Sequence, residues 1–132
     1  MKEENSNDFI IIDDDPINNM ICTRIIQLKF PQARVKTFTS PEKGLEYVLD
    51  SYDTDGIDKA TLFLDINMPV LSGWDVLDRF RDSAGSVQNR VSIYMLSSSV
   101  DGHDKEKADG NGLVSGYVTK PLSQIKLQDI FG

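Results

Sequence analysis

Five polar residues in this sequence come just after, or close the end of, four apolar runs. They are three aspartates, a serine and a lysine: Asp13, Asp14, Asp65, Ser97 and Lys120. Carboxylates that lie close together without compensation repel one another, so a cation is expected between them. Mg²⁺ takes oxygen ligands, is usually held by one or two carboxylates and waters, and leaves room for a phosphoryl oxygen. These residue types therefore indicate phosphoryl chemistry beside a divalent cation.

The same residues suggest individual roles in such chemistry. A carboxylate can act as a nucleophile and form an acyl phosphate, which makes Asp65 the candidate acceptor. Lys120 would pair with Asp65 at rest and with a phosphoryl oxygen afterwards, and the Ser97 hydroxyl can donate to another oxygen. Phosphoryl transfer requires little more than alignment and charge stabilisation. We therefore expect these three residues to carry out the reaction.

Other metals fit the composition less well. The chain has a single histidine, His103, and a single cysteine, Cys22, so imidazole and thiolate ligands for zinc or copper are scarce. No loop of spaced oxygen ligands of the EF-hand kind is present, although calcium stays open. Cys22 stands alone in an amphipathic stretch, where we expect it to pack in the core.

The elements that must position these groups alternate between short apolar runs and longer amphipathic patterns, which is typical of βαβ units around a parallel sheet. Strands are predicted at residues 9–12, 33–38, 61–64, 91–96 and 114–119, and helices at 16–30, 41–51, 73–82, 100–110 and 122–131. A surface loop is predicted at 52–58 and a break at 83–86. The carboxyl ends of parallel strands meet at one edge of the sheet, so the five polar residues should converge there.

Length and charge limit the class of protein. A chain of 132 residues fits one domain, and we expect a tail over residues 1–8 and a single domain over 9–132. A net charge of −7 argues against nucleic acid as a direct partner. The sequence has no apolar run long enough to span a membrane and no signal peptide, so no membrane partner and a cytoplasmic location are expected.

Four motifs in order carry a resemblance to a known family. They are IIDDDP at residues 11–16, LDINMP at 64–69 with Gly73, MLSS at 95–98 and YVTKP at 117–121. Over residues 9–131 the sequence resembles the receiver domain of bacterial two-component response regulators, of the single-domain, chemotaxis-regulator-like kind. The resemblance implies a flavodoxin-like (βα)5 fold, a doubly wound parallel sheet of five strands in the order 2-1-3-4-5. It also implies phosphorylation of Asp65 by a histidine kinase or histidine phosphotransfer protein.

The resemblance further implies a metal site. Asp14 and Asp65 would ligate Mg²⁺ directly, Asp13 would act mainly through water, and Asn67 would contribute its backbone carbonyl. Positions Asn67 and Ser99 would tune the rate of dephosphorylation.

A switch is implied as well. Ser97 matches the hydroxyl that moves toward the phosphoryl group, and Tyr117 matches the aromatic residue that changes rotamer with it. The bond between Lys120 and Pro121 is expected to be cis. The surface formed by helix 100–110, strand 114–119 and helix 122–131 would then change its binding to an unknown protein target.

Other interpretations of these residues are purely structural or assign the protein to another functional class. The aspartates at 13–15 could simply cap a helix, favoured by its dipole. An enzyme that hydrolyses phosphomonoesters through an aspartyl phosphate would need a second acid or base, for which Asp15 is the nearest candidate. A degenerate receiver used only as a scaffold would be expected to lack Asp65 or Lys120. We expect a signalling switch without independent turnover, and the sequence leaves open whether the chain stands alone or is cut from a longer protein.

Overall fold

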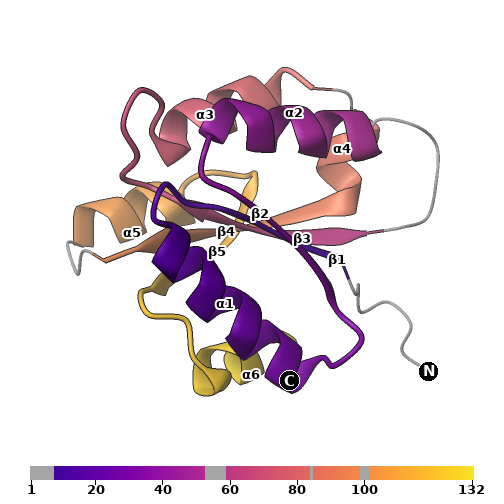
Figure 1. Ribbon diagram of the computed structural model, residues 1–132. Coiled ribbons are helices and arrows are strands. Elements are labelled where there is room, and N and C mark those ends of the chain that lie inside the picture. The colour runs from indigo at the N-terminus through magenta and orange to yellow at the C-terminus, as the bar shows by residue number, and fades with distance from the viewer. Residues whose placement is uncertain (1–7, 53–58, 84, 99–101) are drawn as a thin grey trace.

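The computed structural model describes residues 8–52, 59–83, 85–98 and 102–132, and within them the chain forms five strands and six helices (Figure 1). The strands are β1 (Asp8–Ile12), β2 (Arg34–Phe38), β3 (Ala60–Asp65), β4 (Val91–Ser97) and β5 (Val114–Thr119). The helices are α1 (Pro16–Lys29), α2 (Pro41–Tyr52), α3 (Gly73–Arg81), α4 (Gly85–Arg90), α5 (Gly102–Asp109) and α6 (Gln124–Phe131).

The strands form one parallel sheet in the order β2-β1-β3-β4-β5, as predicted. Figure 1 shows α2, α3 and α4 over one face of the sheet and α1 and α6 over the other. The chain therefore has the doubly wound, flavodoxin-like architecture. The order reverses beside β1, so the ends of β1 and β3 define the switch point where open α/β sheets bind ligands.

Two apolar clusters flank the sheet, and alternate residues of each central strand enter opposite clusters. Ile10 and Ile12 pack under α2 and α3, whereas Phe9 and Ile11 pack against α1 and α6. Every residue of β3 is buried. Burial on both faces explains why these strands are continuous apolar runs in the sequence. Cys22 is fully buried in the second cluster, which confirms its predicted packing role.

Capping side chains begin the helices that flank the strand ends. The Asp15 carboxylate accepts a hydrogen bond from the backbone N–H of Ile17 at 3.0 Å and caps α1. Ser72 and Asp75 form a reciprocal capping box at the start of α3. These caps satisfy donors that a helix start leaves without partners, and they set where each strand-to-helix connection ends.

One helix was not predicted. Residues 83–86 were expected only to break the chain, but α4 begins at Gly85 and places Val87 in the core at 1% exposure. A six-residue helix with one buried apolar side chain has too little periodicity to be recognised from sequence. The prediction of five helices was therefore wrong for the described part of the chain.

Smaller differences concern the ends of the chain and its loops. β1 begins at Asp8, one residue into the expected tail, and the Asp8 carboxylate pairs with Arg34 of β2 at 2.7 Å. Residues 1–7 and the predicted loop at 53–58 lie outside the described residues. Across the ranges that are described, no helix combines the length and the apolar composition needed to span a membrane.

Candidate functional site

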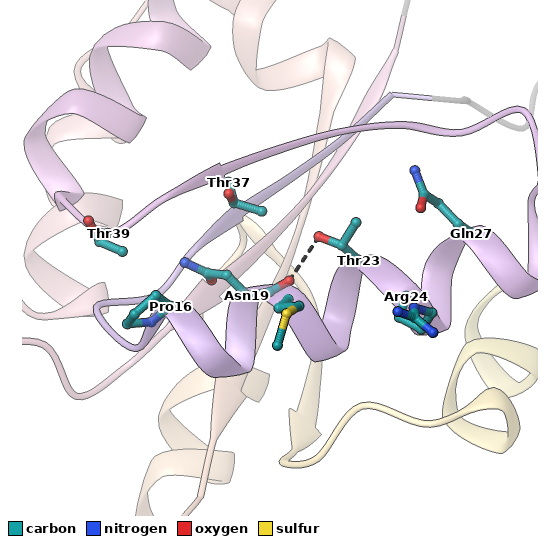
Figure 2. Close-up of a pocket in the computed structure, with 8 residues that line it drawn as sticks. Pro16, Asn19, Thr23, Arg24, Gln27, Thr37 and Thr39 are labelled. Atoms are coloured by element: carbon teal, nitrogen blue, oxygen red, sulfur yellow. Dashed lines mark hydrogen bonds between the residues drawn. The ribbon is translucent and has the colours of Figure 1, made fainter.

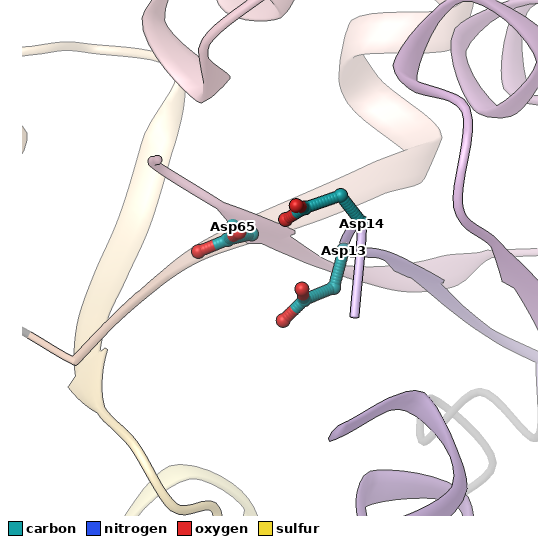
Figure 3. A group of neighbouring side chains, drawn as sticks. All are labelled: Asp13, Asp14 and Asp65. Atoms are coloured by element: carbon teal, nitrogen blue, oxygen red, sulfur yellow. The ribbon is translucent and has the colours of Figure 1, made fainter. Parts of the chain in front are cut away.

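Three carboxylates gather at the carboxyl edge of the sheet (Figure 3). Asp13 and Asp14 follow β1, and Asp65 is the last residue of the neighbouring strand β3. One oxygen from each of these residues lies within 4.8 Å of the others, which is close enough for a single cation to touch all three. Asp13 and Asp65 are buried, whereas Asp14 is exposed. The structure thus brings together the three aspartates that the sequence singled out.

Lys120 completes the cluster from the end of β5. Its Nζ lies 3.1 Å from Asp65 Oδ1 and 2.7 Å from Asp13 Oδ2. The pairing with Asp65 was predicted, whereas the shorter contact with Asp13 was not. The bond from Lys120 to Pro121 is cis, as expected. One ammonium cannot neutralise three carboxylates, so the cluster keeps an excess of negative charge that a divalent cation would compensate.

Asp13 is held by a network that sequence reasoning missed. Its Oδ2 accepts a hydrogen bond from Asn18 Nδ2 at 2.7 Å, and its Oδ1 accepts one from the backbone N–H of Asp15 at 2.9 Å. Asn18 lies in the first turn of α1 and is 9% exposed. The only feature of the sequence that could have predicted this hydrogen bond is the position of Asn18, five residues after Asp13. We infer that Asn18 fixes the orientation of Asp13 and that Asp13 in turn holds Lys120.

The surroundings of the site shift the pKa values of two of its residues, Asp65 and Lys120. Burial and repulsion from Asp13 raise the pKa of Asp65 to about 6, against the opposing influence of Lys120. For Lys120, burial alone would lower the pKa, but hydrogen bonds and charges from Asp13 and Asp65 outweigh burial and raise it. When no cation is bound, ionisation of Asp65 therefore lowers the free energy of unfolding.

This cost leads to a prediction on stability. In buffer with a chelator, Asp65→Asn is expected to raise the free energy of unfolding by about 1 to 3 kcal/mol at about pH 8, because a pKa raised by about two units corresponds to that range. The folded protein binds this proton more tightly than the unfolded chain does. The gain should therefore shrink as the pH falls through 6 and vanish near pH 4, where Asp65 is protonated in both states. Urea unfolding across this pH range measures it.

Asp75→Asn is the control for that measurement, because Asp75 has the opposite shift. The backbone N–H and side chain of Ser72 lower the pKa of this exposed carboxylate. Its replacement is expected to give no gain at any pH and a small loss at neutral pH. A gain from Asp65→Asn that does not depend on pH would contradict the charge-burial explanation.

Comparison with known proteins assigns the family. Residues 9–131 match the family model for the response regulator receiver domain. This chain belongs to that family. Because the match spans nearly the whole chain, both apolar clusters and the acidic site lie within the receiver domain.

Individual relatives agree with the assignment. The crystal structure of a two-component response regulator from Cytophaga hutchinsonii superposes with a TM-score of 0.82 at 29% identity, covering 94% of this chain and 92% of that chain. A response regulator receiver protein from Dyadobacter fermentans gives a TM-score of 0.80 at 25% identity, covering 93% of each chain. Stress response regulator protein 1 of Scheffersomyces stipitis is 32% identical over 96 residues. That match covers 73% of this chain but only 30% of the yeast protein.

The remaining predicted site residues lie around the same edge of the receiver domain. Ser97 is fully buried at the end of β4, and its carbonyl accepts a hydrogen bond from the Lys120 N–H at 2.8 Å. Tyr117 of β5 is half-buried and packs against the cluster under α2 and α3. Asn67 is exposed two residues after Asp65. The metal role of Asn67 and the switch roles of Ser97 and Tyr117 stay predictions, and Ser99 lies outside the described residues.

Gly73 sets how closely α3 approaches Asp65. The N–H of Gly73 donates to the carbonyl of Ile66 at 2.9 Å. A Cβ at this position would collide with the backbone carbonyl of Asp65, so a side chain here would displace the strand end or the helix. Glycine is therefore required at position 73 because any side chain there would collide with the backbone of Asp65.

The loop between Asp65 and α3 contains a strained residue. Val70 has φ of 71°, in the left-handed region that β-branched residues rarely adopt, and it is 92% exposed. Val70→Gly is expected to stabilise the protein by about 1 kcal/mol, because relief of the left-handed strain outweighs the added entropy of the unfolded chain and no packing is lost. Thermal unfolding of Val70→Gly beside Val70→Ala tests this. If the alanine variant gains as much as the glycine variant, backbone strain at Val70 is not the cause.

Proposed function

We propose that this receiver domain is a phosphorylation switch in which Asp65 accepts a phosphoryl group from a histidine kinase or a histidine phosphotransfer protein in a magnesium-dependent reaction. The observation that carries the proposal is the position of Asp65, which ends β3 among two further carboxylates with Lys120 at 3.1 Å. Two buried carboxylates beside a third, exposed one, with a single paired lysine, are poorly explained by stability, since burying the charges destabilises the fold. They are well explained by a site that receives a cation and an anionic phosphoryl group.

In the proposed reaction a carboxylate oxygen of Asp65 attacks the phosphorus of a phosphohistidine on the donor. A phosphorus–oxygen bond forms to Asp65 while the bond from phosphorus to the histidine nitrogen breaks. The histidine nitrogen leaves with the electron pair of that bond and takes a proton from solvent. Asp65 must be ionised to attack, and its ionised form is supported by Lys120.

The donor set fits Mg²⁺. Asp13, Asp14 and Asp65 offer carboxylate oxygens within 4.8 Å of one another, and the backbone carbonyl of Asn67 would add a further oxygen. Both oxygens of Asp13 already accept hydrogen bonds, which supports direct contact through Asp14 and Asp65 and an indirect role for Asp13. When bound, Mg²⁺ would supply positive charge to the phosphoryl oxygens and to the crowded carboxylates.

Lys120 and Ser97 supply the remaining contacts in the proposed switch. Lys120 can move its hydrogen bond from Asp65 to a phosphoryl oxygen, because its ammonium lies 3.1 Å from Asp65 and phosphorylation brings further negative charge to that position. The Ser97 hydroxyl, buried at the end of β4, would turn toward the phosphoryl group. Tyr117 would follow it, and the surface of α5, β5 and α6 would change for a downstream protein.

Exposed apolar residues support a protein as the donor. Ile17 and Met20 on the first turns of α1 are each 62% exposed, and Ile21 beside them is 42% exposed. They directly follow the aspartates of the site in the chain. Apolar side chains gathered on one exposed helix face are typical of a protein contact. A donor seated there would bring its phosphohistidine to Asp65, and such a reaction belongs in the cytoplasm where these kinases transfer phosphate.

We propose a switch and not an enzyme with independent turnover. A phosphohydrolase needs a second acid or base near the acyl phosphate, and Asp15 was the nearest candidate. Its carboxylate instead caps α1 through the N–H of Ile17. Sustained hydrolysis of a phosphomonoester such as p-nitrophenyl phosphate, abolished in Asp65→Asn, would decide for the enzyme.

The proposal is tested with acetyl phosphate and Mg²⁺ on the purified protein. Intact-protein mass spectrometry should find one added phosphoryl group, which is lost on treatment with hydroxylamine as an acyl phosphate is. A chelator should prevent the addition. No addition with Mg²⁺ from either acetyl phosphate or a panel of phosphorylated histidine kinases would refute it.

A further inference from the structure

A polar groove lies between α1 and the edge strand β2 (Figure 2). It has a volume of about 450 Å³, and its polar lining residues are Asn19, Thr23, Arg24, Gln27, Thr37 and Thr39. None of the three site carboxylates lines it. Pro16 and Met20 complete the lining, so the groove borders the α1 face on which the phosphodonor is proposed to dock but does not include Asp65.

One buried atom at this groove lacks a partner. Asn19 is only 4% exposed, and its Nδ2 donates to the carbonyls of Asp13 at 3.0 Å and Phe38 at 3.5 Å. Among the described residues its Oδ1 has no hydrogen-bond partner. Figure 2 shows this side chain projecting from α1 toward Thr37 and Thr39. A buried acceptor without a donor is uncommon in folded proteins, so a donor from water or from a bound molecule is expected at this atom.

Other polar groups of the groove are also available. Within the described ranges, the side chains of Arg24, Gln27, Thr37 and Thr39 form no hydrogen bond or ion pair with the rest of the chain. Thr23 differs, because its hydroxyl donates to the Asn19 carbonyl at 2.8 Å. The groove thus presents one guanidinium, one amide and two hydroxyls to an incoming molecule.

The backbone of β2 is available on the same side of the molecule. Among the described residues β2 pairs with β1 alone, so in this part of the chain its other side is a free edge. The Phe38 carbonyl accepts a hydrogen bond from Asp13 N–H and therefore points to the β1 side. Successive residues of a strand direct their backbone groups to opposite sides, which places those of Val35 and Thr37 at the free edge. An extended segment could pair with them as an added strand.

The positive charges beside the free edge of β2 favour an acidic segment as the added strand. Arg24 lies on the α1 side of the edge, and Lys36 of β2 lies on the other side, over the Tyr47 ring at 5.8 Å. Alternate side chains of a strand point to opposite faces, so two adjacent acidic residues would reach one cation each. Pairing of two copies through β2 would instead bring Arg34 and Lys36 of both chains together, and like charges across a strand pair are destabilising.

We propose that the α1–β2 groove binds an extended acidic segment of a partner protein, which adds to the free edge of β2. The backbone of the segment pairs with Val35 and Thr37. Its carboxylates meet Arg24 and Lys36, and a donor on the segment satisfies Asn19 Oδ1. This binding does not require phosphorylation of Asp65.

The test uses a phage-displayed library of random octapeptides panned against the purified protein, with the selected peptides then titrated in ¹⁵N-edited NMR. Selected peptides are expected to contain adjacent Asp or Glu residues. They should shift the backbone amides of Val35 and Thr37 and the side-chain amide of Asn19. Asp65→Asn protein should bind them equally, which separates this proposal from the proposed phosphorylation.

Two variants target the groove independently. Thr37→Pro removes the N–H at the free edge without touching the β1 side, and proline is tolerated on edge strands. It should reduce peptide affinity at least tenfold. Arg24→Gln should reduce it about fivefold, whereas the control Lys29→Gln, which removes one positive charge from the same helix outside the groove, should leave it unchanged. Circular dichroism verifies that each variant is folded. If Thr37→Pro does not fold, the peptide affinity of Arg24→Gln tests the proposal.

Three outcomes overturn the proposal. The first is no enrichment of acidic peptides, in which case solvent alone satisfies the groove. The second is enriched peptides whose amide shifts lie on α5, β5 and α6. The third is a dimer in sedimentation that Thr37→Pro dissociates, which would assign the edge of β2 to a second copy of this chain.

Discussion

Asp65→Asn protein is expected to take up no phosphoryl group from acetyl phosphate or from a phosphorylated kinase. The amide of asparagine is not a nucleophile, and no other described carboxylate combines the end of a buried central strand with a lysine contact at 3.1 Å. Asp13 cannot substitute, because both of its oxygens accept hydrogen bonds from α1 and its N-terminal turn. Intact-protein mass spectrometry after incubation with Mg²⁺ measures the loss.

The controls for Asp65→Asn separate loss of chemistry from loss of fold. Asp78→Asn removes an exposed carboxylate that pairs with Arg81, and it should accept phosphate like the unchanged protein. The Asp65→Asn variant itself is expected to be more stable without metal, so unfolding cannot explain its inactivity. Phosphoryl uptake that persists in Asp65→Asn would mean that Asp65 is not the acceptor.

Lys120→Met is expected to slow phosphoryl uptake by about 100-fold, in the range found when one electrostatic partner of a transition state is removed. Lys120 Nζ touches Asp65 and Asp13 together, so it compensates the two buried carboxylates where negative charge arrives. The time course of phosphoryl incorporation at saturating Mg²⁺ measures the effect. Lys120→Arg keeps the charge but not the compact ammonium, so an intermediate rate is expected.

Lys105→Met is the matched control for Lys120→Met. Within the described part of the chain, Lys105 forms only an exposed pair with Asp109 on α5, and its loss should leave the rate unchanged. The position of Lys120 also stabilises the fold, because Asp13 is fully buried and would lose its cation. The rate must therefore be read at a temperature where Lys120→Met is folded. An unchanged rate with lowered stability would give Lys120 a structural role alone.

Most of the architecture could be predicted from local patterns. The run Phe9–Ile12 is apolar at every position, and such a run indicates a strand covered on both faces. Each of the five strands was found in its place, and four of them, all except β2, end in or lead directly into a polar residue of the site. Strands can be recognised from a single sequence because their burial produces an apolar pattern over a few neighbouring residues.

Contacts between distant residues were predicted less completely. The sequence placed Lys120 and Asp65 at one edge of the sheet, but nothing in it indicated that Lys120 lies still closer to Asp13. The role of Asn18 was missed for the same reason, because its donation to Asp13 depends on the angle at which α1 leaves the sheet. The helix α4 was missed because its stability comes from one buried valine and not from its own periodicity.

What the sequence alone determined is the set of strands, the five longer helices and the set of reactive groups, because all of them depend on residue types within a few positions of one another. What only the tertiary structure decided is which polar atoms meet and which do not. The raised pKa of Asp65, the left-handed Val70 and the unpartnered Asn19 Oδ1 all belong to that second group. Each is fixed by side-chain packing between segments far apart in the chain, to within a few tenths of an ångström, and local sequence patterns carry no information at that precision.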